Sequence, residues 1–100
     1  MRIAELERNA QHASRRLKTL ANPHRLMILC NLFKCEHTVG ELETVVGLSQ
    51  SAISQHLARL RDEGVVDCRR AGQNVYYSLT DEDTQRLLEA LYGIYCRKPG

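Results

Sequence analysis

The first twenty residues carry apolar side chains at intervals of three and four positions. The seam they form consists of Ile3, Leu6, Ala10, Ala13, Leu17 and Leu20. This spacing predicts a helix over residues 3–20 that buries a narrow strip. A helix that packs only on its own domain usually buries a wider stripe, and the two central alanines allow another helix to approach closely. We therefore expect this helix to pack against a second copy of the chain, with packing inside its own domain as the alternative.

A second helix is predicted to start after Asn22, whose side chain can cap it. Pro23 then occupies the first helical position, where its missing N–H costs nothing. The apolar positions of this helix follow the spacing i, i+3, i+4 and i+7, and they are Leu26, Leu29, Cys30 and Phe33. The pattern puts Cys30 on the apolar face.

Two shorter helices are predicted next, with a glycine between them. Thr38 and Glu41 form the signature of a capping box for a helix over residues 39–46, and Gly47 can adopt the left-handed conformation that ends it. Ser49 caps a fourth helix that runs to about Glu63, before Gly64. The inward positions of the fourth helix are Ile53, Leu57 and Leu60, and its other faces are polar.

The last third of the chain predicts two strands and a final helix. Alternating apolar positions over residues 65–69 and 74–79 favour a β-hairpin whose turn contains residues 70–73. Thr80 is the predicted cap of the last helix, and the acidic residues after it suit the positive end of the helix dipole. The wide apolar face of that helix consists of Leu87, Leu88, Leu91, Ile94 and Tyr95. We expect residues 1–97 to form one domain and residues 98–100 to form a loose tail.

This order of elements predicts a mainly α fold with a β-hairpin wing: a winged helix-turn-helix with the order ααααββα. The helix after the glycine turn of such a motif enters the major groove of DNA, which requires short side chains with amide or hydroxyl groups. The candidates on the fourth helix are Gln50, Ser51, Ser54 and Gln55 for base edges, and His56 and Arg59 for phosphates. A merely solvated polar face is the alternative, but the preceding helix and the hairpin favour DNA binding.

The predicted hairpin follows the reading helix directly, as a DNA-binding wing does. The polar residues around its tip, which can contact the DNA backbone or the minor groove, are Arg69, Arg70, Gln73 and Asn74. The net charge of +2 is too small to indicate DNA binding by itself. Residues 15–34, however, contain no acidic residue and five basic ones, namely Arg15, Arg16, Lys18, Arg25 and Lys34.

Composition excludes several other classes of protein. With 100 residues, of which 43% are hydrophobic and 26% charged, the chain reads as one small globular domain, not a disordered segment or a coiled-coil rod. A domain of this size buries a limited share of its surface, which favours association. No apolar run approaches about 18 residues and no apolar segment of a signal peptide follows Met1, so we expect a cytoplasmic protein without a membrane partner.

Three segments carry a resemblance to a known family. They are LKTLANPHRL at residues 17–26, LSQSAISQHL at residues 48–57 and GVV at residues 64–66. Together they resemble the ArsR/SmtB family of bacterial winged-helix repressors over nearly the whole chain. The resemblance implies a homodimer that binds an inverted-repeat operator in double-stranded DNA and releases it when an inducer is sensed. The first and last helices would join the dimer, through Ile3, Leu6, Ala10, Ala13, Leu17, Leu88, Leu91 and Tyr95.

The metal sites that the resemblance implies lack their ligands in this sequence. Residues 38–42, where arsenic and cadmium sensors of the family have a Cys-x-Cys motif, contain no thiol, and the last helix contains no histidine for a zinc site. Cys35 and His37 offer two metal ligands, with Cys30 as a further candidate, but such a pair does not complete a tetrahedral site. We therefore expect no metal and no cofactor, and a metal or metalloid sensor stays as an alternative.

Cys30 and Cys96 resemble the cysteine pair of one branch of the family, in which matching cysteines of the second and last helices react with persulfides. The likeness rests on LMILC at residues 26–30 and LYGIYC at residues 91–96. It implies that persulfide or polysulfide oxidises the pair, shifts the last helix and lowers operator affinity. A reactive thiolate requires a nearby cation or helix terminus. On the apolar pattern alone, both cysteines are core residues.

Several alternatives stay open at this point. The inducer can be peroxide or disulfide stress, the cysteines can be inert in a constitutive repressor, and some relatives raise transcription as anti-silencers. A thiol enzyme is disfavoured, because the chain has no Cys-x-x-Cys motif and no glycine-rich phosphate loop. A module that binds only protein would bind no promoter DNA. Cys68 is interpreted as an ordinary strand side chain.

Overall fold

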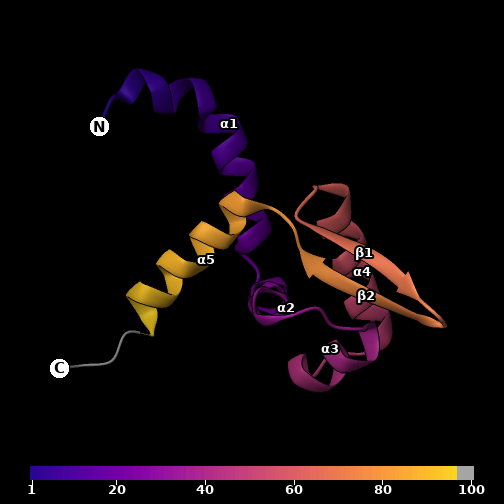
Figure 1. Cartoon of the computed structure of the whole chain (residues 1–100). Coiled ribbons are helices and arrows are strands. Elements are labelled where there is room, and N and C mark those ends of the chain that lie inside the picture. The colour runs from indigo at the N-terminus through magenta and orange to yellow at the C-terminus, as the bar shows by residue number, and fades with distance from the viewer. Residues whose placement is uncertain (97–100) are drawn as a thin grey trace.

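The computed structural model describes residues 1–96, which form five helices and one two-stranded sheet (Figure 1). The elements are α1 (Ile3–Leu20), α2 (Pro23–Lys34), α3 (Val39–Val46), α4 (Gln50–Asp62), β1 (Val66–Ala71), β2 (Asn74–Leu79) and α5 (Glu82–Tyr95). The strands are antiparallel, with Val66 opposite Leu79 and Ala71 opposite Asn74. The predicted order of elements is confirmed, whereas the predicted tail at residues 98–100 lies outside the described residues.

The hydrophobic core lies between α2, α3, α4 and the hairpin. α2 packs on α1, α3 and β2, while α4 packs on α3 and β1. The fully buried apolar side chains are Ile28, Leu29, Leu42, Ile53, Leu57, Leu60 and Val65. Each stabilises the fold by about 1.5–3 kcal/mol relative to an exposed position. The inward face predicted for the fourth helix is thereby confirmed.

Side-chain caps fix the starts of three helices as predicted. Asn22, Thr38 and Ser49 each accept backbone N–H groups of the first turn of α2, α3 and α4. Glu41 completes the capping box, since its carboxylate accepts the backbone N–H of Thr38 at 2.8 Å. Gly47 has a φ of +79°, the left-handed conformation that ends α3 and turns the chain into α4.

The turn of the wing is tighter than predicted. β1 extends to Ala71, so the turn contains only Gly72 and Gln73 instead of residues 70–73. Gly72 has a φ of +63°, as the first position of a two-residue hairpin turn requires. The predicted first strand was too short because Arg70 and Ala71 continue the backbone ladder, opposite Val75 and Asn74.

The start of α5 was assigned to the wrong residue. The cap is Asp81, whose carboxylate accepts the backbone N–H of Thr84 at 3.0 Å, and not Thr80. A carboxylate and a hydroxyl can both accept the free N–H groups at the start of a helix. The carboxylate also carries a negative charge, which interacts favourably with the helix dipole.

The inward face of α2 is rotated from the predicted stripe. Its buried residues are Arg25, Ile28, Leu29 and Leu32, whereas Phe33 is 41% exposed. Leu26 and Cys30 are half-buried and pack against the edge of the core. Because α2 is apolar on more than one face, its periodicity does not select a single stripe.

α1 and α5 extend away from the core on the side opposite the wing (Figure 1). Their far ends expose large apolar side chains, with Ile3 at 65%, Tyr92 at 68% and Tyr95 at 79% exposure. The other exposed members are Leu6, Leu17 and Ile94, while Ala13 and Leu91 are half-buried and Ala10 is exposed. Leu88, predicted for the dimer interface, is only 5% exposed and belongs to the core of its own chain, because it lies on the inward face of α5.

Arg25 joins the end of α1 to the start of α2. Its Nε donates to the carbonyl of Thr19 at 2.8 Å, and its Nη2 donates to the carbonyl of Lys18 at 3.1 Å. Thr19 in turn donates its hydroxyl to Glu63, after α4, at 2.6 Å. The two Arg25 bonds reach carbonyls of the last turn of α1, of which that of Lys18 also accepts the N–H of Ala21 at 3.3 Å. The side-chain bonds of Arg25 and Thr19 fix three helices at one point.

Replacing Arg25 with methionine keeps much of the side-chain volume and removes both donors from the α1 carbonyls. We expect the free energy of unfolding to fall by about 1–3 kcal/mol, because the carbonyl of Thr19 is left without its buried donor. Urea denaturation at a fixed protein concentration measures this. The matched control is Arg61→Met, which removes only an exposed ion pair with Asp67 and should cost less than about 1 kcal/mol. Equal losses in the two variants would contradict the role of Arg25.

Candidate nucleic-acid interface and cysteine pair

The first half of α4 presents a polar surface to solvent. All four predicted base readers, Gln50, Ser51, Ser54 and Gln55, are exposed, opposite the buried side of the helix. The helix follows α3 through the left-handed Gly47, which gives the two helices a helix-turn-helix arrangement. Amides can pair with adenine edges and hydroxyls with several bases, so this surface is chemically suited to the major groove.

The wing is exposed at each of the predicted residues, but its two arginines differ. Arg69, Arg70, Gln73 and Asn74 are all exposed. Arg69 pairs with Glu36, a residue of the loop between α2 and α3, whereas Arg70 makes no ion pair within residues 1–96. Sequence reasoning missed Glu36, since 33 positions separate it from Arg69 and no local pattern marks it. Arg70 is therefore the cation of the wing that is available for DNA.

His56 differs electrostatically from the phosphate contact that was predicted. It is half-buried, and its ring lies 6.3 Å from that of His24. Burial lowers the pKa of His56, and the positive charges of Arg25, His24 and Arg59 lower it further. In the free protein, the neutral form of the imidazole is therefore favoured over the cation.

Part of the basic charge is used inside the protein. Arg59 pairs with Glu63 at 3.3 Å, and Arg16 pairs with Asp81 at 3.4 Å. Arg25 caps the end of α1, as described above. Two of the five basic residues within residues 15–34, Arg16 and Arg25, therefore interact with other groups of the protein.

A pocket lies between α2 and α5, with Cys30 on its wall. Its volume is about 530 Å³, and its lining residues are Cys30, Phe33, Lys34, Leu88, Glu89 and Tyr92. Cys96 is the residue that follows α5 and is exposed, whereas Cys30 is half-buried. Both thiols are free.

The surroundings of Cys30 do not activate its thiol. Burial raises the pKa of Cys30 above its ordinary value, and the negative charge of a Cys96 thiolate raises it further. Cys30 lines the pocket between α2 and α5, and Cys96 directly follows α5. Less of Cys30 is therefore thiolate at neutral pH than of an ordinary thiol, and the exposed Cys96 is the more accessible nucleophile.

The other candidate ligands do not gather into a site. Cys35 is exposed at the end of α2, and Cys68 is half-buried in β1 opposite Tyr77. Within residues 1–96, no three histidine, cysteine or acidic side chains lie close enough to hold a metal ion. In the same part of the chain, none of the helices combines the length and the apolar character that crossing a membrane demands.

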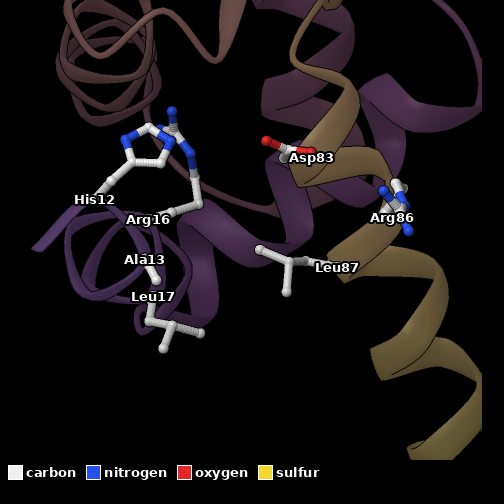
Figure 2. A pocket seen from close by; sticks show the side chains of 7 residues that line it. All are labelled: His12, Ala13, Arg16, Leu17, Asp83, Arg86 and Leu87. Atoms are coloured by element: carbon white, nitrogen blue, oxygen red, sulfur yellow. The ribbon is translucent and has the colours of Figure 1, made fainter. Parts of the chain in front are cut away.

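A second pocket separates α1 from α5 (Figure 2). It has a volume of about 460 Å³ and is lined by His12, Ala13, Arg16, Leu17, Asp83, Arg86 and Leu87. Figure 2 shows the side chains of α1 on one side and those of α5 on the other. Ala13 and Leu17 were predicted dimer residues, so the pocket is continuous with the exposed apolar ends of the two helices.

The exposed reading helix, the helix before it and the adjoining hairpin define a DNA-binding protein of the winged helix-turn-helix class. Residues 22–67 match the model of the arsR family of bacterial regulatory proteins. The transcriptional activator HlyU of Vibrio cholerae serotype O1 is 44% identical over 97 residues, which are 97% of this chain and 90% of the relative. The chain belongs to the ArsR family and is a transcriptional regulator.

Solved structures agree with this assignment. The crystal structure of the transcriptional repressor BigR from Xylella fastidiosa has a TM-score of 0.92 and 40% identity, and the match covers 98% of this chain and 100% of that one. A possible ArsR-family regulator of Mycobacterium bovis, described as a homodimeric winged helix-turn-helix DNA-binding domain, has a TM-score of 0.76 and 33% identity. That match covers 85% of this chain and 79% of the other. The winged-helix fold is thereby confirmed.

The two thiols should differ in their rate of alkylation. In the reduced protein, iodoacetamide should modify Cys96 and the exposed control Cys35 before Cys30, because the thiolate is the reactive form and burial raises the pKa of Cys30. The rate at Cys30 should keep rising with pH above about 8.5, where an ordinary thiol is already half ionised. Peptide mass mapping over time measures all three sites. If Cys30 is modified as fast as Cys35 near neutral pH, burial does not protect the Cys30 thiol and the prediction is wrong.

Proposed function

We propose that the chain is a homodimeric repressor that binds an inverted-repeat operator and loses affinity for it when sulfur species join Cys30 to Cys96. The observation that carries the proposal is the location of Cys30 in the pocket between α2 and α5 and of Cys96 directly after α5, both outside the exposed DNA-reading surface. A covalent link there would act on α5 and not on the DNA contacts themselves. We propose that the protein acts in the cytoplasm, where the operator DNA and the sulfur species are found.

Gln50, Ser51, Ser54 and Gln55 are the proposed base-reading residues. The proposed backbone or minor-groove contacts are His56, Arg59, Arg70, Gln73 and Asn74. The support is the exposure of these side chains on the reading helix and the wing. Two such helices in a dimer would enter successive major grooves on one face of the duplex, which matches an inverted repeat.

The proposed dimer interface is the exposed apolar surface along α1 and the far end of α5. Exposed Ile3, Leu6, Leu17 and Tyr95 contribute apolar surface there, with Ala10, Ala13 and Leu91 beside them. An apolar surface that spans two projecting helices is unusual for a monomer and typical of an interface. The homodimeric description of the Mycobacterium bovis domain supports the same arrangement.

The proposed chemistry starts at the exposed thiol. The Cys96 thiolate attacks the central sulfur of an organic trisulfide, RS–S–SR, and one RS⁻ leaves. The Cys30 thiolate then attacks that same central sulfur and displaces the second RS⁻, which leaves Cys30–S–S–S–Cys96 as the product. The two protein thiols are oxidised, the trisulfide is reduced to two RSH, and the two protons end on the released thiols. The pocket beside Cys30 provides room for the added sulfur.

The DNA contacts can be tested on an operator selected from random duplexes. Gln55→Ala should weaken specific binding about tenfold and relax base preference at one position, because a bidentate amide contact contributes about 1–3 kcal/mol of discrimination. Arg70→Gln should weaken binding to all sequences and reduce the slope of log Kd against log salt by about 0.9, the contribution of one phosphate. Fluorescence anisotropy measures both. Gln11→Ala, which removes an exposed amide from α1, is the matched control, and an equal loss in it would contradict the assignment.

The sulfur chemistry can be tested on anaerobically reduced protein treated with glutathione trisulfide, glutathione persulfide or peroxide. Intact mass should increase by one sulfur less two hydrogens after trisulfide treatment, and operator affinity should fall about 100-fold, which corresponds to about 2.7 kcal/mol of coupling. Cys30→Ser and Cys96→Ser should abolish both changes, whereas the control Cys35→Ser should keep them. If the wild type binds the operator but forms no Cys30–Cys96 link, the proposal of sulfur sensing is wrong. The proposal of operator binding is then unaffected.

A further inference from the structure

The loop between α2 and α3 is joined to the wing by backbone hydrogen bonds. The N–H of His37 donates to the carbonyl of Tyr77 at 3.0 Å, and the N–H of Tyr77 donates to the carbonyl of His37 at 2.8 Å. Both bonds are of ordinary length, and together they form an antiparallel bridge beside β2. The loop therefore extends the wing by one short bridge, and α2 ends only three residues before it.

A side-chain pair reinforces this junction on the neighbouring strand. Arg69 donates from Nε to Oε2 of Glu36 at 2.9 Å, and its Nη2 donates to Oε1 of the same carboxylate. The Arg69 guanidinium also lies 4.8 Å from the centre of the ring of Tyr76, its partner across the hairpin. The bidentate pair lowers the pKa of Glu36 and raises that of Arg69. The Arg69 side chain is thereby held against Glu36 and Tyr76 in the outer half of the hairpin.

The neighbouring arginine has a different environment. Successive side chains of a strand point to opposite faces, so Arg69 and Arg70 lie on different faces of the hairpin. Within residues 1–96, Arg70 is exposed and makes no ion pair, whereas Arg69 is neutralised by Glu36 and stacked on Tyr76. A phosphate at Arg69 would share the guanidinium with the Glu36 carboxylate, whereas a phosphate at Arg70 would meet a full positive charge, which makes Arg69 the poorer phosphate ligand of the two.

We infer that Arg69 is a positioning residue, which fixes the angle of the wing against the loop after α2 through Glu36, while Arg70 contacts the DNA backbone. The inference rests on the proposed binding of operator DNA. It assigns to Glu36, an acid, a favourable contribution to the binding of a polyanion. Simple electrostatics predicts the opposite sign, so the two accounts are separable by experiment.

The test compares Glu36→Ala, Arg69→Ala, the double variant and the charge swap E36R/R69E on the selected operator, over a series of salt concentrations. If Arg69 positions the wing, each single variant weakens binding about three- to fivefold, in the range of an exposed bidentate pair. The double variant then binds no worse than either single one, the salt slope stays unchanged, and the swap recovers most of the affinity. The control Glu43→Ala removes the same charge from α3, where Glu43 forms no ion pair within residues 1–96.

A phosphate contact of Arg69 predicts a different set of results. If Arg69 contacts a phosphate, Arg69→Ala lowers the salt slope by about 0.9 and Glu36→Ala strengthens binding as much as Glu43→Ala does. That pattern overturns the inference. Amide hydrogen exchange of free protein gives a second readout that needs no DNA: exchange over residues 66–79 should accelerate in both single variants and return toward wild type in the swap. Unchanged exchange overturns the inference, whereas a wild type that binds no operator overturns the proposed DNA function alone.

Discussion

The position of α2 is the constraint on which the rest of the structure depends. Its N-terminal Arg25 holds the last carbonyls of α1, and its buried leucine and isoleucine side chains pack against α3 and β2. The loop after it forms a bridge with β2 through His37 and Tyr77. Because packed interiors do not deform continuously, α2 can move only if several of these contacts change together. α2 therefore contacts both the projecting part of the molecule and the wing, and connects them mechanically.

This arrangement explains how a change at a half-buried cysteine can reach a distant DNA surface. Cys30 lies on the side of α2 that faces α5, whereas the other side of α2 belongs to the core. A link to Cys96 would alter the relation of α5 to α2, and α5 together with α1 forms the proposed dimer face. In the proposed dimer, the distance between the two reading helices would depend on that face. Coupling of a few kcal/mol is within the ordinary range for such transitions, so no large rearrangement is needed.

Most of the fold could be predicted from the sequence, because its signals are local. Helix caps at Asn22, Thr38 and Ser49 and the left-handed Gly47 act within a few residues of their own position. The inward face of α2 could not be predicted, since that helix is apolar on more than one side and only its neighbours decide which side is buried. The prediction of the α5 cap was wrong because Thr80 and Asp81 can both cap a helix. The helix dipole favours the carboxylate of Asp81.

The candidate site was predictable in its chemistry but not in its charge balance. The polar face of α4 and the cysteine pair are visible in the sequence, yet the acids that pair with Arg59 and Arg69 are visible only after folding. Glu36 illustrates why, since an isolated acid in a loop carries no signal until a strand 33 positions away lies beside it. Counting cations along the chain therefore overestimates the charge available to DNA. Base-edge hydrogen bonds from α4 would then supply the sequence specificity of the proposed operator binding, and they depend on the angle at which α4 and the wing are held.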